Sequence, residues 1–182
     1  GFNSVYHVTD LPCFITGNHV YMFDPHRKHL PAGPKGQRKA GRKLGFDKYS
    51  VCPDQFAPFI RSSEAAATEF LVPPPVDGKL QSYDGTLFRL PLRTSEIAQN
   101  SSLCKEAFTD AMMMEMFNSF KNDIREMSLF LKNIKSIKLM IWEDGASEPT
   151  LFAESLTEDS DVTEAQKIPE MLRSPDLASI LD

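Results

Sequence analysis

The chain has 182 residues, of which 41 % are hydrophobic and 25 % are charged, and its formal net charge is −5. That length and apolar content predict one domain with a tail, and they exclude a wholly disordered protein. No apolar stretch approaches the roughly 20 residues that span a bilayer, and three widely spaced cysteines form neither a disulfide framework nor a metal knuckle, so we expect a cytoplasmic protein without a membrane partner.

Residues 1–24 predict a helix and then a strand. Residues 1–8 place apolar side chains at helical spacing. Pro12 ends this helix because proline disfavours helical geometry in the residue before it. Residues 19–24 are β-branched and aromatic, and Pro25 follows them, so this segment predicts a strand.

Residues 25–48 are rich in glycine, proline and positive charge. The segment 27–43 contains seven Lys or Arg residues, whose summed field could attract phosphates or nucleic acid. It lacks interleaved aromatic residues, and its glycines and prolines disfavour a stable helix or strand. We therefore expect a long solvated loop, and nucleic-acid binding through residues 27–43 is a distant alternative.

Two further segments predict a strand and a long helix. Asp84 and Gly85 predict a turn that precedes a strand over residues 87–92. Because Pro91 cannot donate to a strand ladder, we expect this strand at the edge of its sheet. Apolar residues that recur at steps of three and four predict a helix over residues 105–131.

The C-terminal third predicts a hairpin and an acidic tail. Residues 134–142 and 150–156 have the composition of strands, with a turn between them. Residues 140–182 contain eleven acidic and two basic side chains, so we expect a weakly structured segment over residues 157–182. Together the elements predict an α+β domain over residues 1–156, a two-layer sandwich in which helices cover one mixed, mostly antiparallel sheet.

No complete catalytic constellation can be assembled from the sequence. The four histidines have no cysteine or carboxylate at metal-ligand spacing, and His26 and His29 flank two basic residues of the predicted loop. No serine or cysteine stands in a nucleophile motif. We therefore predict no metal site and no catalytic residue in this chain.

Two short segments each pair a glycine with the expected start of an element. Residues 1–3 join a glycine to a predicted helix start, where free backbone N–H groups and the helix dipole favour an anion. Gly85 and Thr86 head the predicted strand. In this order and separation, the two segments resemble the second and third sequence boxes of the Bergerat-type ATP-binding fold. Heat-shock protein 90, DNA gyrase, histidine kinases and mismatch-repair proteins share that fold.

The neighbouring residues narrow this resemblance to the repeated chaperone-like regions of the sacsin family. Six blocks over residues 1–142 are similar to those regions in type and order. The blocks read GFNSVYH, TDLP, MFDPH, DQFAPF, GTLFRLPLR and LFLK. The resemblance therefore implies a heat-shock protein 90-like ATPase fold, present in part.

The resemblance also implies nucleotide-binding roles for particular residues. Gly1 and Phe2 match the end of the glycine box beside the nucleotide phosphates, and Asn3 would begin the helix behind that box. Thr86 matches the third-box threonine near the adenine. In the family, the catalytic glutamate, the magnesium-binding asparagine and the adenine-reading aspartate lie before the glycine box. We therefore expect a piece of a longer protein, in which the complete domain binds ATP and Mg²⁺. By itself this chain is expected to hydrolyse no ATP and to bind scarcely any, since the residue that reads adenine would be absent.

The function implied by the resemblance is that of a chaperone or co-chaperone module. Its partners would be client proteins, other chaperones and the remaining domains of the longer protein. The alternative is a degenerate repeat that keeps the fold as a non-catalytic scaffold for protein contacts. The sequence before Gly1 separates the two, because the ATPase requires the three upstream polar residues.

Overall fold

The computed structural model describes residues 2–33, 35–61, 68–131 and 133–156. The chain forms two compact units, Gly1–Met112 and Met113–Asp182, and each is described by itself. The predicted acidic segment 157–182 lies outside the described residues. Within the described ranges, no helix combines the length and the apolar character needed to cross a bilayer.

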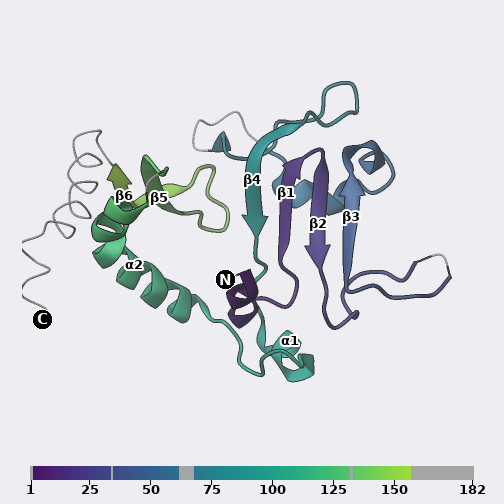
Figure 1. Ribbon diagram of the computed structural model, residues 1–182, viewed down its shortest axis with the longest axis horizontal. Helices are drawn as coiled ribbons and strands as arrows, with labels where there is room; N and C mark the ends of the chain where they lie inside the picture. The colour runs from purple at the N-terminus through teal and green to yellow at the C-terminus, as the bar shows by residue number, and fades with distance from the viewer. Residues whose placement is uncertain (1, 34, 62–67, 132, 157–182) are drawn as a thin grey trace, which may run out of the picture. The chain divides into compact units, whose positions relative to one another are not determined.

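Four antiparallel strands form the sheet of the first unit (Figure 1). They are β1 (Cys13–Gly17), β2 (His19–Phe23), β3 (Gly41–Gly45) and β4 (Tyr83–Arg89), in the order β3-β2-β1-β4. Strand β2 confirms the strand predicted over residues 19–24. The turn between β1 and β2 contains Gly17 at a φ of +53°, a conformation that glycine adopts without steric cost.

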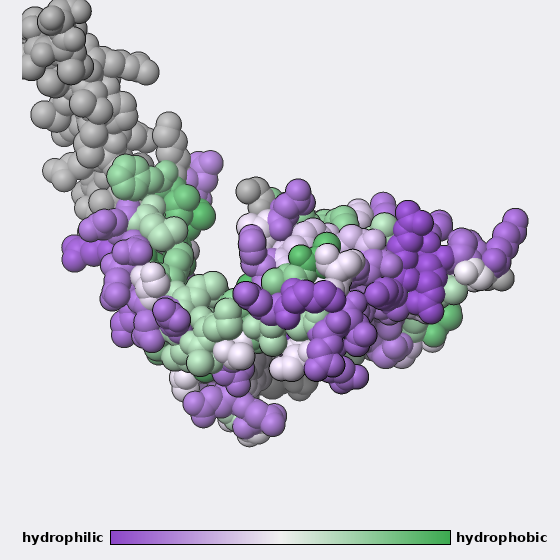
Figure 2. Space-filling model, turned by 90° about the horizontal axis from the view of Figure 1, so that it is seen from below, coloured by the Kyte–Doolittle hydropathy of each residue, from purple (hydrophilic) through white to green (hydrophobic). Residues whose placement is uncertain are grey.

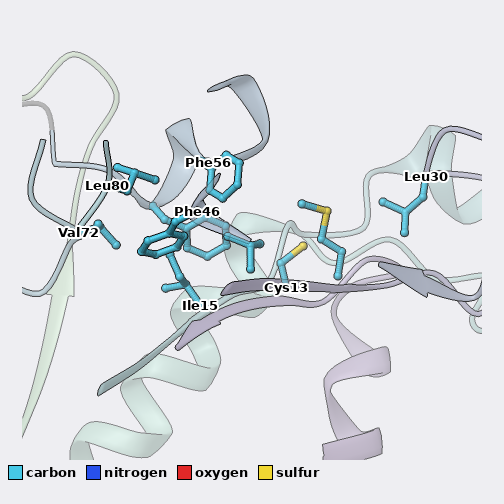
Figure 3. Close-up of a cluster of buried hydrophobic side chains, with 10 residues drawn as sticks. Cys13, Ile15, Leu30, Phe46, Phe56, Val72 and Leu80 are labelled. Atoms are coloured by element: carbon cyan, nitrogen blue, oxygen red, sulfur yellow. The ribbon is translucent and has the colours of Figure 1, made fainter. Parts of the chain in front are cut away.

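One face of this sheet is covered by a hydrophobic core. Alternate residues of β1 and β2 point to that face, because successive side chains of a strand lie on opposite sides. The sheet contributes Cys13, Ile15, Val20 and Met22, and the segments around it contribute Leu30, Phe46, Phe56, Phe59, Val72 and Leu80 (Figure 3). Three short 3₁₀ helices lie among these segments, namely η2 (Phe46–Lys48), η3 (Pro53–Gln55) and η4 (Ala57–Phe59). The core is thus covered by short 3₁₀ turns and loops.

The prediction of one long loop over residues 25–48 is wrong, because the segment contains β3 and η2. Five backbone pairs join β3 to β2, from Phe23 opposite Gly41 to His19 opposite Gly45. Packing explains why residue 41 is glycine, since a Cβ built there would lie 2.9 Å from the carbonyl oxygen of Met22. Lysine and arginine fit β3 because it is an edge strand of the described sheet.

Two local predictions near β4 and the N-terminus also need correction. Asp84 and Gly85 lie within β4 and do not form a separate turn. Gly85 adopts a φ of +136°, which bends the strand where an ordinary residue would be strained. Residues Phe2–His7 form the 3₁₀ helix η1 and not the start of an α-helix. The edge position expected for the strand before Pro91 is confirmed, because β4 ends at Arg89 on the edge of the sheet.

The second unit contains one long helix and a hairpin. Helix α2 (Asp110–Phe130) begins five residues later than predicted, and β5 (Ser136–Ile141) pairs with β6 (Thr150–Leu156). The antiparallel pairing confirms the predicted hairpin. The helix contacts β6 through the rings of Phe117 and Phe152, whose centroids lie 6.1 Å apart, and through hydroxyls of Ser128 and Ser155 that lie 3.0 Å apart.

The chain has the predicted α+β class with mostly antiparallel pairing, but the prediction of a single sheet is wrong. In the described residues, β5 and β6 form a two-stranded sheet of their own. The places beside β2 are taken by β1 and β3, which the sequence patterns did not indicate. Helix α2 packs on β6 within its own unit.

Candidate functional site

The sheet face opposite the core is rich in aromatic side chains. We call this the aromatic face and define it by Phe14 on β1, Tyr21 and Phe23 on β2, and Phe88 on β4. The rings of Phe14 and Tyr21 stack with centroids 4.8 Å apart, and those of Phe14 and Phe88 lie 5.3 Å apart. The pairing of Phe14 with both Tyr21 and Phe88 across the ladders brings these rings together.

Phe2, a residue predicted to lie beside nucleotide, packs on this aromatic face. Its ring centroid lies 5.5 Å from that of Phe23 and 6.1 Å from that of Phe88. Phe2 and Phe88 are nevertheless 42 % and 50 % exposed. A large part of both rings is therefore open to a ligand. Asn3 follows in η1 and is exposed, whereas Gly1 lies outside the described residues.

Thr86, the second predicted contact, lies on the same face. It pairs with Thr16 across the β1–β4 ladder, and their hydroxyl oxygens lie 3.4 Å apart. The Thr16 hydroxyl donates to the carbonyl of Gly85 at 2.8 Å. Because Thr86 and Phe88 are two residues apart on one strand, they point to the same side. The structure thus places Phe2 and Thr86 on one face of one sheet.

A buried ion pair lies behind η1 and holds it in place. Arg93 is fully buried, and its Nε donates to Asp10 Oδ1 at 2.6 Å. The same guanidinium donates to the backbone carbonyls of Tyr6 and His7 at the end of η1. One side chain therefore ties the residues after β4 to the short helix that begins at Phe2.

Two histidines complete the surroundings of Asp10. His26 Nε2 lies 3.4 Å and His29 Nε2 4.0 Å from Asp10 Oδ2, and His26 Nδ1 lies 2.6 Å from the hydroxyl of Ser102. Burial alone would raise the pKa of Asp10. Hydrogen bonds from Arg93 and Ser101, with the charges of Arg93 and His26, outweigh burial and hold that pKa below its ordinary value.

Asp24 shapes the loop that delivers these histidines. Its buried carboxylate accepts hydrogen bonds from the backbone N–H groups of Lys28, His29 and Leu30 at 3.2, 2.8 and 2.8 Å. This arrangement satisfies three donors of one tight loop with a single side chain. Such use of the carboxylate is structural, and it directs His26 and His29 toward Asp10.

A pocket of about 300 Å³ adjoins this network. It is lined by Asp10, Lys28 and His29 on one side and by helix α1 (Ser95–Asn100) with Thr94 on the other. The Thr94 hydroxyl caps α1 by accepting from the N–H of Ile97 at 3.3 Å. Among the residues that the structure describes, no group of three or more His, Cys, Asp or Glu side chains is arranged to hold a metal ion.

The sequence analysis gave no role to the residues of this network, although it quoted the segments that contain them. Asp10, Asp24, His26 and Arg93 all lie in the blocks TDLP, MFDPH and GTLFRLPLR. The sequence carries no signal that these residues meet, because Asp10 and Arg93 are 83 residues apart. Only the fold brings Asp10, His26 and Arg93 together.

Comparisons of the whole chain with known proteins support the family resemblance that the six sequence blocks indicated. Residues 1–154 match the model of the sacsin domain family. The chain belongs to the sacsin domain family. It is 34 % identical over 152 residues to sacsin from Homo sapiens, a match that covers 84 % of this chain and 3 % of the human protein. The chain thus spans a small part of the length of the relative it matches.

Proposed function

We propose that this sacsin domain is a chaperone-related module whose aromatic face contributes to a nucleotide-binding site. The observation that supports the proposal is the placement of Phe2 and Thr86 on one face of the four-stranded sheet. The resemblance gives these two residues to the phosphate side and the adenine side of a single site. A shared face is the arrangement that such a site requires.

The chemistry of the face suits a nucleotide. The exposed ring of Phe88, two residues from Thr86 on β4, offers a surface on which a base can stack, and stacking on aromatic rings tolerates any base. The Thr86 hydroxyl donates to the Thr16 hydroxyl at 3.4 Å, and its oxygen can accept a hydrogen bond from a ligand beside the rings. We propose ATP with Mg²⁺ as the ligand of the complete domain, and we assign these residues to binding and not to hydrolysis.

The alternative is a protein-binding scaffold that uses the same surface. Exposed aromatic side chains are common anchors of protein interfaces. Phe2 and Phe88 are exposed enough to serve as such anchors for a client protein. This alternative requires no nucleotide, and so a binding measurement separates the two.

The test is a titration of the complete domain with ATP and Mg²⁺, followed by nuclear magnetic resonance. We expect Thr86→Val, which keeps the side-chain shape and removes the hydroxyl, to weaken binding about tenfold, and Thr86→Ser to restore it. Thr150→Val is the matched control, because Thr150 is also an exposed strand residue but lies on β6. Equal affinities for Thr86→Val and the unchanged chain would contradict the assignment of Thr86.

A second measurement addresses the chaperone part of the proposal. The chain is added to a heat-aggregating enzyme, and light scattering is followed with and without ATP. Suppression that changes with ATP supports the nucleotide-dependent module. Suppression that is the same with and without ATP, together with no ATP binding, supports the scaffold.

A further inference from the structure

The connection between β2 and β3 encloses a pocket of about 370 Å³ on the first unit. Its lining includes the cations Lys39, Arg42 and Lys43, the amide of Gln37, and the apolar side chains of Leu30 and Pro31. Leu30 is also buried in the hydrophobic core, so one wall of the pocket is continuous with that core. Figure 2 shows hydrophilic side chains gathered at the end of the first unit where this loop projects.

The segment that lines this pocket is positively charged along the sequence. Residues 25–46 contain seven Lys or Arg side chains and no Asp or Glu. Asp24 precedes them, but its carboxylate is fully buried and accepts three backbone N–H groups. The field at the pocket mouth is therefore strongly positive, which favours an anion.

Several of these groups are held in place before any ligand binds. The Arg42 guanidinium donates to the carbonyl of Pro31 at 3.0 Å. Lys43 also borders the pocket, but its Nζ lies 5.5 Å from the ring centroid of Tyr21 on the aromatic face, so its charge is not assigned to the site. The Gly33 N–H donates to the carbonyl of Gln37 at 2.8 Å and closes the loop. Fixed cations lose less side-chain entropy on binding than free ones. Lys39 is exposed and is available to complete the site.

Two glycines keep the pocket open to this arrangement. A Cβ at Gly33 would lie 2.7 Å from Gln37 Nε2, and a Cβ at Gly41 would lie 2.9 Å from the backbone oxygen of Met22. Larger residues at these positions would force the loop or the amide to move. The small residues therefore shape the walls that bring the cations together.

We propose that this pocket binds a small soluble molecule bearing a diphosphate or two neighbouring phosphates. Its volume falls in the range of small-molecule sites, about 300–1,000 Å³, and lysine and arginine are the usual partners of phosphate oxygens. The pocket lies at β3, whereas Thr86 lies on β4 at the opposite edge of the described sheet. The site is thus separate from the nucleotide face and does not depend on it.

The test compares two lysines of the same loop. Lys39 lines the pocket, whereas Lys35 carries the same charge four residues away and is not part of the lining. Binding of inorganic pyrophosphate to the full chain is measured by calorimetry for Lys39→Gln and Lys35→Gln. If the pocket binds pyrophosphate, we expect Lys39→Gln to weaken binding about tenfold and Lys35→Gln to weaken it by no more than about twofold. Thr86→Val should leave pyrophosphate binding unchanged.

Three results would overturn the proposal. One is the absence of pyrophosphate binding to the unchanged chain at millimolar concentration. Another is an equal loss in the two lysine variants, which would indicate a diffuse field. The third is binding of a short DNA duplex that is tighter than that of pyrophosphate and equally sensitive to both lysines, which would favour the nucleic-acid alternative. Both lysines are exposed, so neither variant is expected to unfold the chain.

Discussion

Arg93 and Asp10 form a buried ion pair that joins the segment after β4 to the residues after η1, with Nε and Oδ1 2.6 Å apart. Arg93 also binds the carbonyls of Tyr6 and His7. The pair therefore sets the position of η1, and through it the position of Phe2 against Phe23 and Phe88. This contact therefore helps to hold the Phe2 ring against the aromatic face.

Removing Arg93 should destabilise the first unit strongly. In Arg93→Ala, the buried Asp10 carboxylate loses its charged partner, and such losses typically reduce the free energy of unfolding by about 3–5 kcal/mol. Urea unfolding measures the change. The matched control is Lys138→Ala, because Lys138 forms an exposed pair with Glu154 at 3.3 Å. Exposed pairs contribute about 1 kcal/mol or less, so comparable losses in the two variants would contradict the burial of Arg93.

Asp10 should make folding sensitive to acid. Its pKa in the folded chain lies below the ordinary value of 3.8. The ionised carboxylate therefore stabilises the folded state above that value, and the stabilisation is lost as the pH falls through the folded pKa. We expect the urea midpoint to fall as the pH decreases from about 5 to below the folded pKa, and Asp10→Asn to reduce that fall. Asp47→Asn, a change at an exposed carboxylate, should leave the fall as it is.

Ile124 should be the more costly of two positions to change on α2. Ile124 is 5 % exposed, whereas Met116 is 46 % exposed. Ile124→Ala should lower the free energy of unfolding by about 2–5 kcal/mol, because it leaves a cavity beneath the helix. Met116→Ala should change it by about 0.5 kcal/mol or less. A thermal melt that ranks the two variants in the opposite order would show that the helix presents another face to β6.

The three cysteines should react at different rates with an alkylating reagent. Cys13 is buried in the core of the first unit, and burial raises the pKa of its thiol, which lowers the fraction of reactive thiolate. Cys52 and Cys104 are partly exposed. Mass spectrometry after brief treatment with iodoacetamide should find label on Cys52 and Cys104, and on Cys13 only in urea. Rapid labelling of native Cys13 would contradict the packing of β1.

The sequence predicted the elements whose periodicity is set locally. The apolar repeat of α2 and the strand-like composition of β2, β5 and β6 are each readable within one segment. Strand β3 was missed because Gly41–Gly45 is polar and glycine-flanked, and only its ladder to β2 makes it a strand. Gly85 was misread because glycine is typical of turns, whereas here it lies within β4.

For the candidate site too, the sequence indicated residues within short segments but not the contacts between distant segments. Phe2 and Thr86 were found from a resemblance in short blocks, and their shared face follows from the ladder between Thr16 and Thr86. The Asp10, His26 and Arg93 cluster joins three distant blocks through side chains. No spacing within one segment encodes such a contact, because it depends on the tertiary fold.

The most direct test of the nucleotide proposal is a nuclear Overhauser measurement on the complete domain with ATP and Mg²⁺. If the aromatic face binds nucleotide, protons of the adenine should show cross-peaks to the methyl group of Thr86, and ATP protons should also show them to the ring of Phe2. Saturable ATP binding with cross-peaks only to residues of the β2–β3 loop, or no binding at millimolar ATP, would contradict it.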